Sequence, residues 1–322
     1  MTRIFTRRDV RDLLSIDDCI AAVESVFRAF GEGAVAPPGS LGIHVDGGGF
    51  HIKAAAVGRT FAAKINANFP ANPGRHGLPT IQGVVVVSDA DRGTPLAIMD
   101  SMEITTLRTA AASAVAAKYL AREDAAVVTI CGCGVQGRAH LEALTRVRAV
   151  RHAFACDADR ASASRFADDM QRTLGIAVDA ARLDEAIDGS DIVVTSTPSR
   201  TAFIRREHLH PGLFIAAVGA DHPEKSEIDP AALVMTRVVV DLLDQAATMG
   251  DLHHAIAAGV MRREDVHADL GQIIAGLRPA RVSDDEIFLF DSTGTALQDA
   301  VAADVVYRRG VERNAGTEVA LT

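Results

Sequence analysis

A glycine-rich segment at residues 130–137 constrains the fold of this chain more than any other feature of its sequence. The segment follows a β-branched run, opens a helical pattern, and its last glycine stands twenty positions before Asp157. Gly132 suits a tight turn, Gly134 allows the backbone to approach a pyrophosphate, and Gly137 allows the helix to pack closely on the strand. Strand, glycine loop, helix and a second strand that ends in an acid together predict a dinucleotide-binding βαβ unit.

The acid at the end of the second strand narrows the choice of dinucleotide. A carboxylate at Asp157 accepts hydrogen bonds from the adenosine ribose hydroxyls and repels a 2′-phosphate, so we expect NAD (as NADH when reduced) rather than NADP. Arg160 keeps NADP open, because an arginine beside that position can receive a 2′-phosphate. The residues expected at the cofactor from this region are Gly132, Cys133, Gly134, Val135, Gln136, Gly137 and Asp157.

The composition describes a globular chain that is long enough for two domains. Its 322 residues are 48% hydrophobic, which is sufficient for a large core. A net charge of −9 without a basic run, together with only 4% aromatic residues, argues against a nucleic-acid partner. The apolar runs are too short for a membrane span, so we expect a cytoplasmic protein with no membrane partner.

The four cysteines and eleven histidines do not predict a metal site. The cysteines lack a CxxC spacing, and three of them fall in or beside the predicted nucleotide-binding strands, where we expect buried packing residues. No HExxH pattern occurs, and the paired histidines have no carboxylate or cysteine at ligand spacing. We therefore expect no metal.

Two kinds of periodicity divide the chain. The first third is predicted to contain a helix and short, mainly antiparallel strands, and strands then alternate with helices along most of the remaining chain. We predict an α/β protein with a doubly wound parallel sheet, a Rossmann domain, at residues 114–296. A smaller α+β domain is expected at residues 1–113 and is completed by residues 297–322. Residues after Arg313 are expected to form a loosely ordered tail.

The strand predicted at residues 60–69 alternates between apolar and polar side chains. One face carries Phe61, Ala63, Ile65, Ala67 and Phe69, and the other carries Lys64, Asn66 and Asn68. The preceding strand likewise places His51 and Lys53 on one side. We expect the apolar faces to be dry, and the polar faces to be either a solvated surface or the basic wall of a site.

Arg108 stands alone in an alanine-rich helical stretch that is otherwise almost uncharged. Because the planar guanidinium matches a carboxylate with two parallel hydrogen bonds, this position indicates a buried or cleft-facing anion ligand. The alternative is a structural ion pair.

Asp221 closes an apolar run at the carboxyl end of a predicted parallel strand, where doubly wound sheets bind their ligands. A partly desolvated carboxylate there is expected to have a raised pKa and to exchange a proton with a substrate nitrogen or an attacking water. The alternative role is to cap the next helix, near Pro223.

These segments together resemble the ornithine cyclodeaminase/μ-crystallin family over residues 36–306. The matching motifs, in chain order, are Lys64-Ile65-Asn66, Gly77-Leu78-Pro79-Thr80 with Gln82-Gly83, Leu107-Arg108-Thr109-Ala110-Ala111, the glycine loop, Gly219-Ala220-Asp221, and Phe290-Asp291-Ser292-Thr293-Gly294. The family includes cyclodeaminases, alanine dehydrogenases, imine and ketimine reductases, and the partly ligand-binding μ-crystallins, so membership alone does not choose a substrate.

The resemblance implies a homodimer in which the smaller, substrate-binding domain forms the subunit contact, and an active site between the two domains of each chain. At matching positions it implies that Lys64 and Arg108 hold the substrate α-carboxylate, with Lys64 near the reacting nitrogen. Thr80 would add a hydrogen bond, and Asp221 would be the acid/base group. The turn from Ser292 to Gly294 would border the nicotinamide, and Thr197 is also expected to bind the cofactor.

Two departures from the family pattern bear on the substrate. Family members often have an arginine after the proline break as another carboxylate ligand, whereas this chain reads Pro38-Gly39-Ser40. Ornithine cyclodeaminases carry a glutamate before a Met-Pro pair on the strand preceding the lysine strand, and this chain has no acid at residues 51–55. A cationic ω-amine beside Lys53 would cost on the order of one to several kcal/mol at a separation of about 4 Å.

The basic side chains instead favour a substrate with two carboxylates. The expected cluster consists of His51, Lys53, Lys64 and Arg108, with Arg75 and His76 on a neighbouring loop. We predict an NAD-dependent imine reductase that converts iminosuccinate to aspartate, with Lys64, Arg108 and Asp221 as catalytic residues. The alternatives are an alanine dehydrogenase or ketimine reductase, an ornithine cyclodeaminase that forms proline and ammonia, and a non-enzymatic, μ-crystallin-like NAD(P)H-dependent binding protein.

Overall fold

The computed structural model describes residues 1–321 and divides the chain into two compact units. Unit 1 comprises Met1–Arg108 and the chain from Thr295 onward, and unit 2 comprises Thr109–Gly294. The first boundary falls inside helix α4, and the second follows strand β14. Unit 1 is therefore built from two segments that are distant in sequence, whereas unit 2 is continuous.

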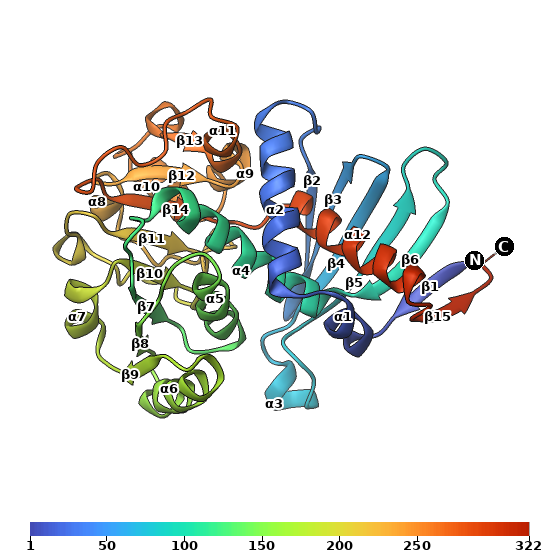
Figure 1. Cartoon of the computed structure of the whole chain (residues 1–322), viewed down its shortest axis with the longest axis horizontal. Helices are drawn as coiled ribbons and strands as arrows, with labels where there is room; N and C mark the ends of the chain where they lie inside the picture. Colours follow the sequence, from blue (N-terminus) through green and yellow to red (C-terminus); the bar gives the residue numbers. More distant parts are fainter. Residues whose placement is uncertain (322) are drawn as a thin grey trace. The chain divides into compact units, whose positions relative to one another are not determined.

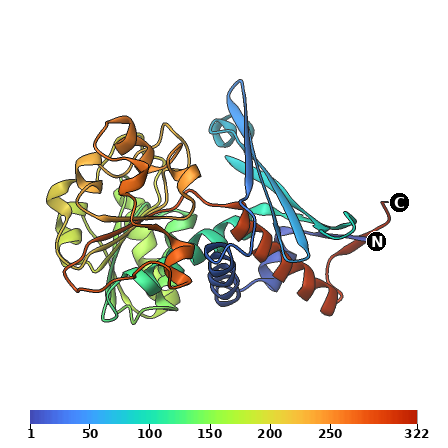
Figure 2. The ribbon, with the colours of Figure 1, turned by 90° about the horizontal axis from the view of Figure 1, so that it is seen from above.

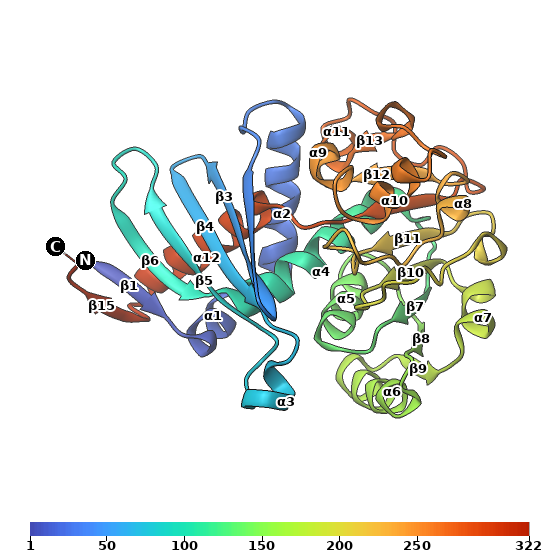
Figure 3. The same ribbon diagram turned by 180° about the vertical axis from the view of Figure 1, so that it is seen from behind.

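Within the described residues, unit 1 holds a seven-stranded sheet in the order β15-β1-β6-β5-β4-β3-β2 (Figure 1). Its strands pair antiparallel, except that β1 and β6 are parallel. The connection between β4 and β5 carries the short helix α3 (Figure 3). The elements are β1 (Thr2–Phe5), α1 (Arg7–Leu13), α2 (Ile16–Gly31), β2 (Gly39–Val45), β3 (Gly48–Val57), β4 (Thr60–Asn68), α3 (Asn72–His76), β5 (Ile81–Asp89), β6 (Pro95–Asp100), α4 (Ser101–Leu120), which continues into unit 2, α12 (Ala296–Glu312) and β15 (Thr317–Val319).

Strand β15, close to the end of the described chain, is an edge strand of this sheet. β15 pairs antiparallel with β1, and Arg3 donates a hydrogen bond to the Ala315 carbonyl at 2.7 Å and forms an ion pair with Glu318 at 2.6 Å. The prediction of a loosely ordered tail after Arg313 was therefore wrong. Its partners lie at the other end of the described chain, where a local sequence pattern cannot indicate them.

Helix α12 covers one face of the sheet and joins it to α2 (Figure 2). It packs on β3, β4 and β5 and also against α2. The start of α2 is fixed by a capping box in which Ser15 and Asp18 exchange side-chain and backbone hydrogen bonds. Arg309 of α12 pairs with Asp18 at 2.6 Å, which ties the two helices together.

In the single chain the apolar face of β4 is more exposed than the sequence predicted, and the polar face is more buried than a solvated surface would be. Lys64 is buried together with its cross-strand neighbour Val85, whereas Phe61 and Ile65 on the other face are each 38% exposed in the single chain. The face predicted to be dry is the exposed one, and the polar row lies on the side that α12 covers. Alternation along a strand separates two faces but does not say which of them a distant helix will bury.

Within residues 109–294, unit 2 contains an eight-stranded sheet in the order β13-β12-β14-β11-β10-β7-β8-β9, and all neighbouring strands are parallel. The predicted fold class is confirmed: a doubly wound parallel sheet accompanies a smaller unit with mainly antiparallel strands. β14, the last strand of the unit in sequence, lies inside the sheet between β12 and β11. The elements are β7 (Val127–Cys131), α5 (Val135–Thr145), β8 (His152–Cys156), α6 (Arg160–Leu174), β9 (Ala177–Ala180), α7 (Leu183–Ala186), β10 (Ile192–Thr195), β11 (Phe214–Ala217), α8 (Pro230–Leu233), β12 (Arg237–Val240), α9 (Leu243–Ala246), α10 (Asp251–Ala257), β13 (Ala268–Asp269), α11 (Leu270–Ile274) and β14 (Phe288–Asp291), with short 3-10 helices at Ile187–Gly189, Arg206–His208 and Arg263–Asp265.

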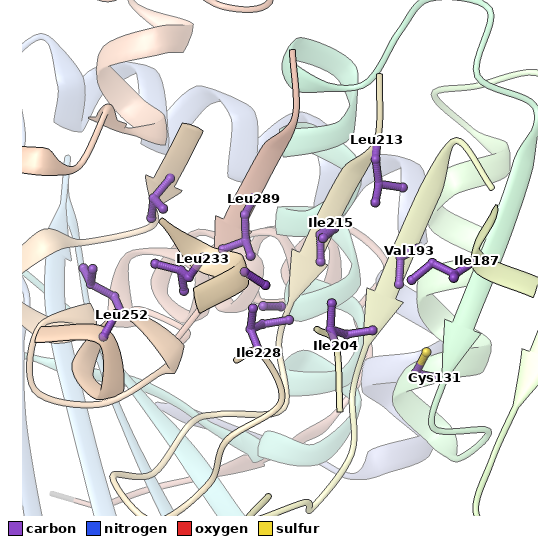
Figure 4. Packing of buried hydrophobic residues seen from close by; sticks show 14 of the residues in the cluster. Cys131, Ile187, Val193, Ile204, Leu213, Ile215, Ile228, Leu233, Leu252 and Leu289 are labelled. Carbon is purple, nitrogen blue, oxygen red and sulfur yellow. The ribbon is translucent and has the colours of Figure 1, made fainter. Parts of the chain in front are cut away.

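The central strands of this sheet are buried along their whole length. β10, β11 and β14 consist of buried residues throughout, as expected for a parallel sheet covered on both faces. Val193, Ile215 and Leu289 belong to one apolar cluster that also contains Ile228 and Leu252 (Figure 4). This core fixes the strand ends that carry the polar residues described below. In the described part of the chain, no helix has the length and apolar character of a membrane span.

Candidate active site

The glycine-rich loop connects β7 to α5, and two of its glycines are required by their surroundings. Gly132 has a φ of +99°, and a Cβ there would lie 2.7 Å from the Ser196 carbonyl oxygen. A Cβ on Gly137 would lie 2.2 Å from the Gly132 carbonyl oxygen. Gly134, in contrast, has nothing within 4 Å of such an atom. The loop is therefore tightly packed at its two ends and open at Gly134, where its backbone can approach a ligand.

The first turn of α5 leaves its backbone N–H groups without a side-chain cap. Gly134 is the N-cap, and no acidic residue lies in this turn. Free N–H donors at the positive end of a helix dipole are the arrangement that binds phosphate groups. Val135 is 69% exposed beside them, and the buried side-chain oxygen of Gln136 has no hydrogen-bond partner among the described residues. These residues fit a dinucleotide cofactor.

Asp157 follows β8 and is hydrogen-bonded to the glycine loop. Its Oδ2 accepts a hydrogen bond from the Cys133 backbone N–H at 2.8 Å, and its Oδ1 accepts one from the Asp159 N–H at 2.9 Å. Asp157 is nevertheless exposed, so its carboxylate retains acceptor capacity for ribose hydroxyls. Arg160 is exposed as well, at the first position of α6.

The other residues predicted for the cofactor follow β10 and β14. Thr197 donates its N–H and its hydroxyl to Glu227, both at 2.6 Å, and Gly294 donates its N–H to Asp241 at 2.6 Å. Ser292 is buried, and its hydroxyl has no hydrogen-bond partner within residues 1–321. All three stand just beyond the carboxyl ends of parallel strands, where ligands of doubly wound sheets bind.

Among the buried carboxyl groups of unit 2 that the sequence analysis did not assign to a site are Glu227, Asp251 and Asp291. Burial raises the pKa of all three, that of Asp251 to about 7 with the charge of Glu227 adding to the effect. Their donors are neutral and include the Thr195 hydroxyl and Gly219 N–H to Glu227, the Glu227 and Ile228 N–H groups to Asp251, and the Leu252 N–H to Asp291. Within the described chain, no set of three or more His, Cys, Asp or Glu side chains is placed to hold a metal ion.

In unit 1, Lys64 and Arg108 converge on Asp299 of α12. Lys64 Nζ lies 2.8 Å from each carboxylate oxygen of Asp299, and Arg108 Nε lies 2.9 Å from Oδ1. Arg108 Nη1 also donates to the Gln298 side-chain oxygen at 2.6 Å. The three charged side chains are at most 6% exposed. The ion pair that the sequence offered as the alternative role of Arg108 is therefore present.

The charges around Lys64 determine how readily it holds its proton. The pKa of Lys64 is lowered from 10.5 to about 7: burial is the largest cause, Arg108 and Lys53 act in the same direction, and Asp299 opposes them. Burial by itself would raise the pKa of Asp299, but Arg108 and Lys64 outweigh it and bring that pKa below its ordinary value. The cluster thus holds one ionised acid and a lysine that titrates in the neutral range.

His51 and Lys53 lie on the same face of the sheet as Lys64. Lys53 stands directly opposite Lys64 in the pairing of β3 with β4, and His51 stands opposite Asn66. Directly opposed residues of antiparallel strands project to the same side. Both residues are half-buried. The strand register therefore brings together His51, Lys53 and Lys64 of the predicted basic group, whereas Arg75 and His76 lie exposed in α3.

Asp299 and Gln298 are the side chains of this cluster that sequence reasoning missed. Asp299 lies on the buried stripe of α12, four and seven positions before Ala303 and Val306, which are fully buried. An acid at such a position indicates a buried partner of opposite charge. That signal could have identified Asp299, although not its partners.

Asp221 does not have the environment that its sequence position predicted. It lies in the turn after β11, its side chain is 53% exposed, and it pairs with Lys225 at 2.6 Å. In the described chain the next helix, α8, begins only at Pro230. The carboxylate is therefore neither desolvated nor a helix cap, because the chain leaves the sheet through an exposed turn. Thr80 is half-buried, and its carbonyl accepts the Phe69 N–H at 2.8 Å.

Comparison with known proteins extends the likeness seen in the motifs to nearly the whole chain. The model of the ornithine cyclodeaminase/mu-crystallin family matches residues 1–314. The chain belongs to this family. The resemblance inferred from the sequence motifs is confirmed, and the family contains proteins that differ in substrate.

Three solved structures illustrate that range. An archaeal alanine dehydrogenase dimer with bound NAD is 37% identical, with a TM-score of 0.97, and covers 100% of this chain and 99% of its own. The Δ1-pyrroline-2-carboxylate reductase of Thermococcus litoralis, in complex with NADH and L-proline, is 30% identical, with a TM-score of 0.94 and coverage of 99% and 100%. The iminosuccinate reductase of Paracoccus denitrificans, in complex with NAD⁺, is 30% identical, with a TM-score of 0.92 and coverage of 99% of each chain.

Proposed function

We propose that this chain is an NAD-dependent oxidoreductase that reduces a small α-imino acid, with iminosuccinate as substrate and aspartate as product. The observation that carries the proposal is the basic cluster of unit 1. Three cations, Lys53, Lys64 and Arg108, act there on a single carboxylate, Asp299. With Lys64 protonated, the cluster carries two more positive charges than negative ones. A substrate with two carboxylates neutralises both.

Other substrate classes match this charge less well. A monocarboxylate offers the three cations of the cluster one anionic group fewer than a dicarboxylate does, so it gains less from these partly buried surroundings. The side-chain amine of ornithine would add a further cation and would be repelled. The charge balance therefore favours the dicarboxylate within a family that also handles smaller and cationic substrates.

NAD is the cofactor of this proposal, and in its reduced form it supplies the hydride. The open backbone at Gly134 and the uncapped start of α5 would hold the pyrophosphate, and Asp157 would accept the ribose hydroxyls. Ser292 and Gly294 would border the nicotinamide. NAD or NADH in the three similar structures supports this assignment.

The basic side chains bind and orient the substrate in this mechanism. Arg108 holds the α-carboxylate, and the ammonium of Lys64 binds the same group and keeps the imine nitrogen protonated, which makes the imine carbon electrophilic. Lys53 and His51 bind the distal carboxylate. Thr80 adds a hydrogen bond. Holding the imine carbon at near-attack distance supplies much of the reduction of the barrier.

Asp221 orients the substrate nitrogen and relays protons in the same proposal. Its exposure gives it direct proton exchange with water. Asp221→Asn should therefore lower turnover much more than it weakens NADH binding, measured side by side by initial rates and by NADH fluorescence. Equal losses of both would assign this carboxylate a structural role.

We also propose that two copies associate through the outer face of the unit 1 sheet. Its exposed apolar side chains are Leu41, Ile43, Phe50, Phe61, Ile65 and Val84, between 37% and 56% exposed in the single chain. Apolar side chains grouped on one sheet face are typical of an interaction surface. The similar archaeal alanine dehydrogenase is a dimer. Light scattering should give a dimer for the native chain and a monomer for Ile65→Glu.

Initial rates of NADH oxidation with three imine sources test the substrate. Oxaloacetate plus ammonia should give the highest kcat/KM, above pyruvate plus ammonia and above a cyclic ketimine. Lys53→Met should lower the rate with oxaloacetate plus ammonia by about tenfold or more, the value of a charge-assisted hydrogen bond, and leave the rate with pyruvate unchanged. A higher kcat/KM for pyruvate or the ketimine, unchanged in Lys53→Met, would place the chain among the small-substrate reductases.

Two further outcomes would replace the proposed reaction. Formation of proline and ammonia from ornithine, without a net absorbance change of the nicotinamide, would identify a cyclodeaminase. Binding of NADH without turnover of any imine would identify a binding protein.

A further inference from the structure

Lysine is scarce in this chain, and half of its lysines lie at one place. Of 33 lysines and arginines, the lysines are Lys53, Lys64, Lys118 and Lys225. Lys53 and Lys64 stand opposite each other on β3 and β4. An arginine stays charged throughout the physiological range, whereas a buried ammonium can lose its proton. The site therefore has a titratable cation in a chain that uses arginine at most other basic positions.

Asp299 contacts both Lys64, the titratable cation, and Arg108, which stays charged. Lys64 lies 2.8 Å from both of its oxygens, and Arg108 approaches the same carboxylate at 2.9 Å. The neighbouring Gln298 holds the other end of the guanidinium. Lys64 also donates to the Thr105 hydroxyl at 3.4 Å. One carboxylate thus fixes both cations relative to each other.

Within residues 1–321, Asp299 is the acid that acts on Lys64, and Asp18 acts on the more distant Cys19. The other groups facing this region are Arg108 and Thr105 of α4, Lys53 and, one pair further along, His51 of β3, Val85 of β5, and Cys19 of α2, which lies within electrostatic reach of Arg108 and Asp299. Burial raises the pKa of Cys19 to about 12, so its thiol stays neutral. Without the charge of Asp299, burial and the two neighbouring cations would lower the pKa of Lys64 further, and Lys64 would lose its proton well below neutral pH.

We propose that Asp299 is a positioning residue of the reductase: its carboxylate holds Lys64 and Arg108 together for the substrate α-carboxylate and keeps Lys64 in the ammonium form. The inference rests on the proposed function, which assigns both cations to the substrate. Asp299 acts through Lys64 and does not touch the reacting atoms. The pH range in which the enzyme works is thereby set by a residue of the last helix.

The protonation of Lys64 can be measured without any substrate. Protein labelled with carbon-13 at the lysine Cε gives four signals, one for each lysine, and Lys64→Arg assigns the signal of Lys64. We expect this signal to titrate near pH 7, and its midpoint to fall by about one to three pH units in Asp299→Asn. Asp299→Glu keeps the charge and should largely restore the midpoint. A Lys64 midpoint at the ordinary lysine value, or one that does not change in Asp299→Asn, would overturn the proposal.

The pH profile of kcat/KM for imine reduction provides the functional test. The alkaline limb should move toward acid in Asp299→Asn by the same amount as the Lys64 midpoint, and Asp299→Glu should return it. Asp304→Asn is the matched control, because Asp304 lies on the same helix but pairs with Arg308 at 2.8 Å and Thr60 at 2.7 Å. Its profile should match that of the unaltered enzyme.

Two results would overturn the positioning role. An equal loss of kcat/KM at every pH in Asp299→Asn would show that Asp299 only supports the structure. A lower KM at every pH would show that it competes with the substrate carboxylate. Because removal of this carboxylate leaves two buried cations unpaired and can unfold the chain, the titration of the unaltered protein and Asp299→Glu provide tests that do not need Asp299→Asn.

Failure of this inference differs from failure of the proposed function. If no imine is reduced but Lys64 still titrates near neutrality and responds to Asp299, the proposed reaction fails and the control of Lys64 by Asp299 stands. If imines are reduced and the Lys64 midpoint ignores Asp299, only the positioning role fails.

Discussion

The two units of this chain bury carboxylates in opposite ways. In unit 1, Asp299 is paired with two cations, which outweigh its burial and bring its pKa below the ordinary value. In unit 2, Glu227, Asp251 and Asp291 receive hydrogen bonds from neutral N–H and hydroxyl groups, and burial raises their pKa values. The charge of the partner, and not burial alone, therefore decides whether a buried acid stays ionised.

The same contrast gives the two units opposite responses to pH. For Asp251 the pKa rises from 3.8 to about 7 on folding, so its contribution to stability is complete below pH 3.8 and is lost as the pH rises through 7. For Lys64 the pKa falls from 10.5 to about 7, so its contribution is complete above pH 10.5 and is lost as the pH falls through 7.

The largest effect on stability is expected where the cation pairing of unit 1 is broken. Asp299→Asn should lower the free energy of unfolding by about 3–5 kcal/mol at pH 6, because buried Arg108 loses its counter-charge and Lys64 has to give up its proton. The loss should be smaller at pH 9, where Lys64 sheds its proton. Denaturant unfolding followed by circular dichroism measures both values, since the chain has no tryptophan to report by fluorescence. An equal loss at the two pH values would contradict the account of Lys64.

Removal of the titratable cation itself should mainly affect catalysis. Lys64→Met is expected to lower kcat/KM for imine reduction by about 10²–10³-fold, the usual effect of losing one charged group that stabilises a transition state. NADH affinity, measured by cofactor fluorescence, should stay unchanged. Lys118→Met is the control, because Lys118 is an exposed lysine of α4. A parallel loss of NADH binding in Lys64→Met would contradict the proposal that unit 1 binds the substrate and unit 2 binds the cofactor.

In unit 2, replacing a buried carboxyl group by an amide should lower stability only where both carboxyl oxygens accept hydrogen bonds. Glu227 accepts from Thr195, Thr197 and Gly219, so an amide nitrogen at its end would face donors. Glu227→Gln should therefore lower the free energy of unfolding by about 1–3 kcal/mol. Thermal unfolding followed by circular dichroism, with the exposed Glu224→Gln as control, measures this loss. Unchanged stability would mean that the Glu227 carboxyl is not needed by its donors.

The smallest effect is expected at Asp251. One oxygen accepts two N–H groups and the other has no hydrogen-bond partner among the described residues, so Asp251→Asn keeps the observed contacts. It should change stability by less than about 1 kcal/mol at pH 6. It should also flatten the dependence of stability on pH between about 4 and 7 by about 1 kcal/mol per pH unit. Urea unfolding at four pH values tests this, and an unaltered slope would show that another acid takes up a proton in this pH range.

Much of the fold of unit 2 could be predicted, because the sequence patterns that indicate it lie within short stretches of the chain. Gly132 and Gly137 contact each other within one loop, and apolar runs identify the buried parallel strands. The placement of β14 inside the sheet and the pairing of β15 with β1 depend on segments far apart in the chain. For the same reason the sequence separated the two faces of β4 but could not show that α12 buries the polar one.

The candidate site was predictable only in part, for a related reason. Lys64 and Arg108 stand out as isolated charges in apolar or small surroundings. Asp299, their common partner, follows Lys64 by 235 positions, and nothing in either local pattern links them. The exposure of Asp221 could not be predicted either, because it depends on the path of the turn after β11.

Helix α12 follows the last strand of the dinucleotide fold in the chain, and it delivers Gln298 and Asp299. A polypeptide that has emerged from the ribosome only as far as residue 294 holds every strand of the Rossmann sheet but lacks the acid that unites its two buried cations. Under this proposal, such a copy keeps the residues assigned to the coenzyme but lacks the carboxylate that holds Lys64 and Arg108 together.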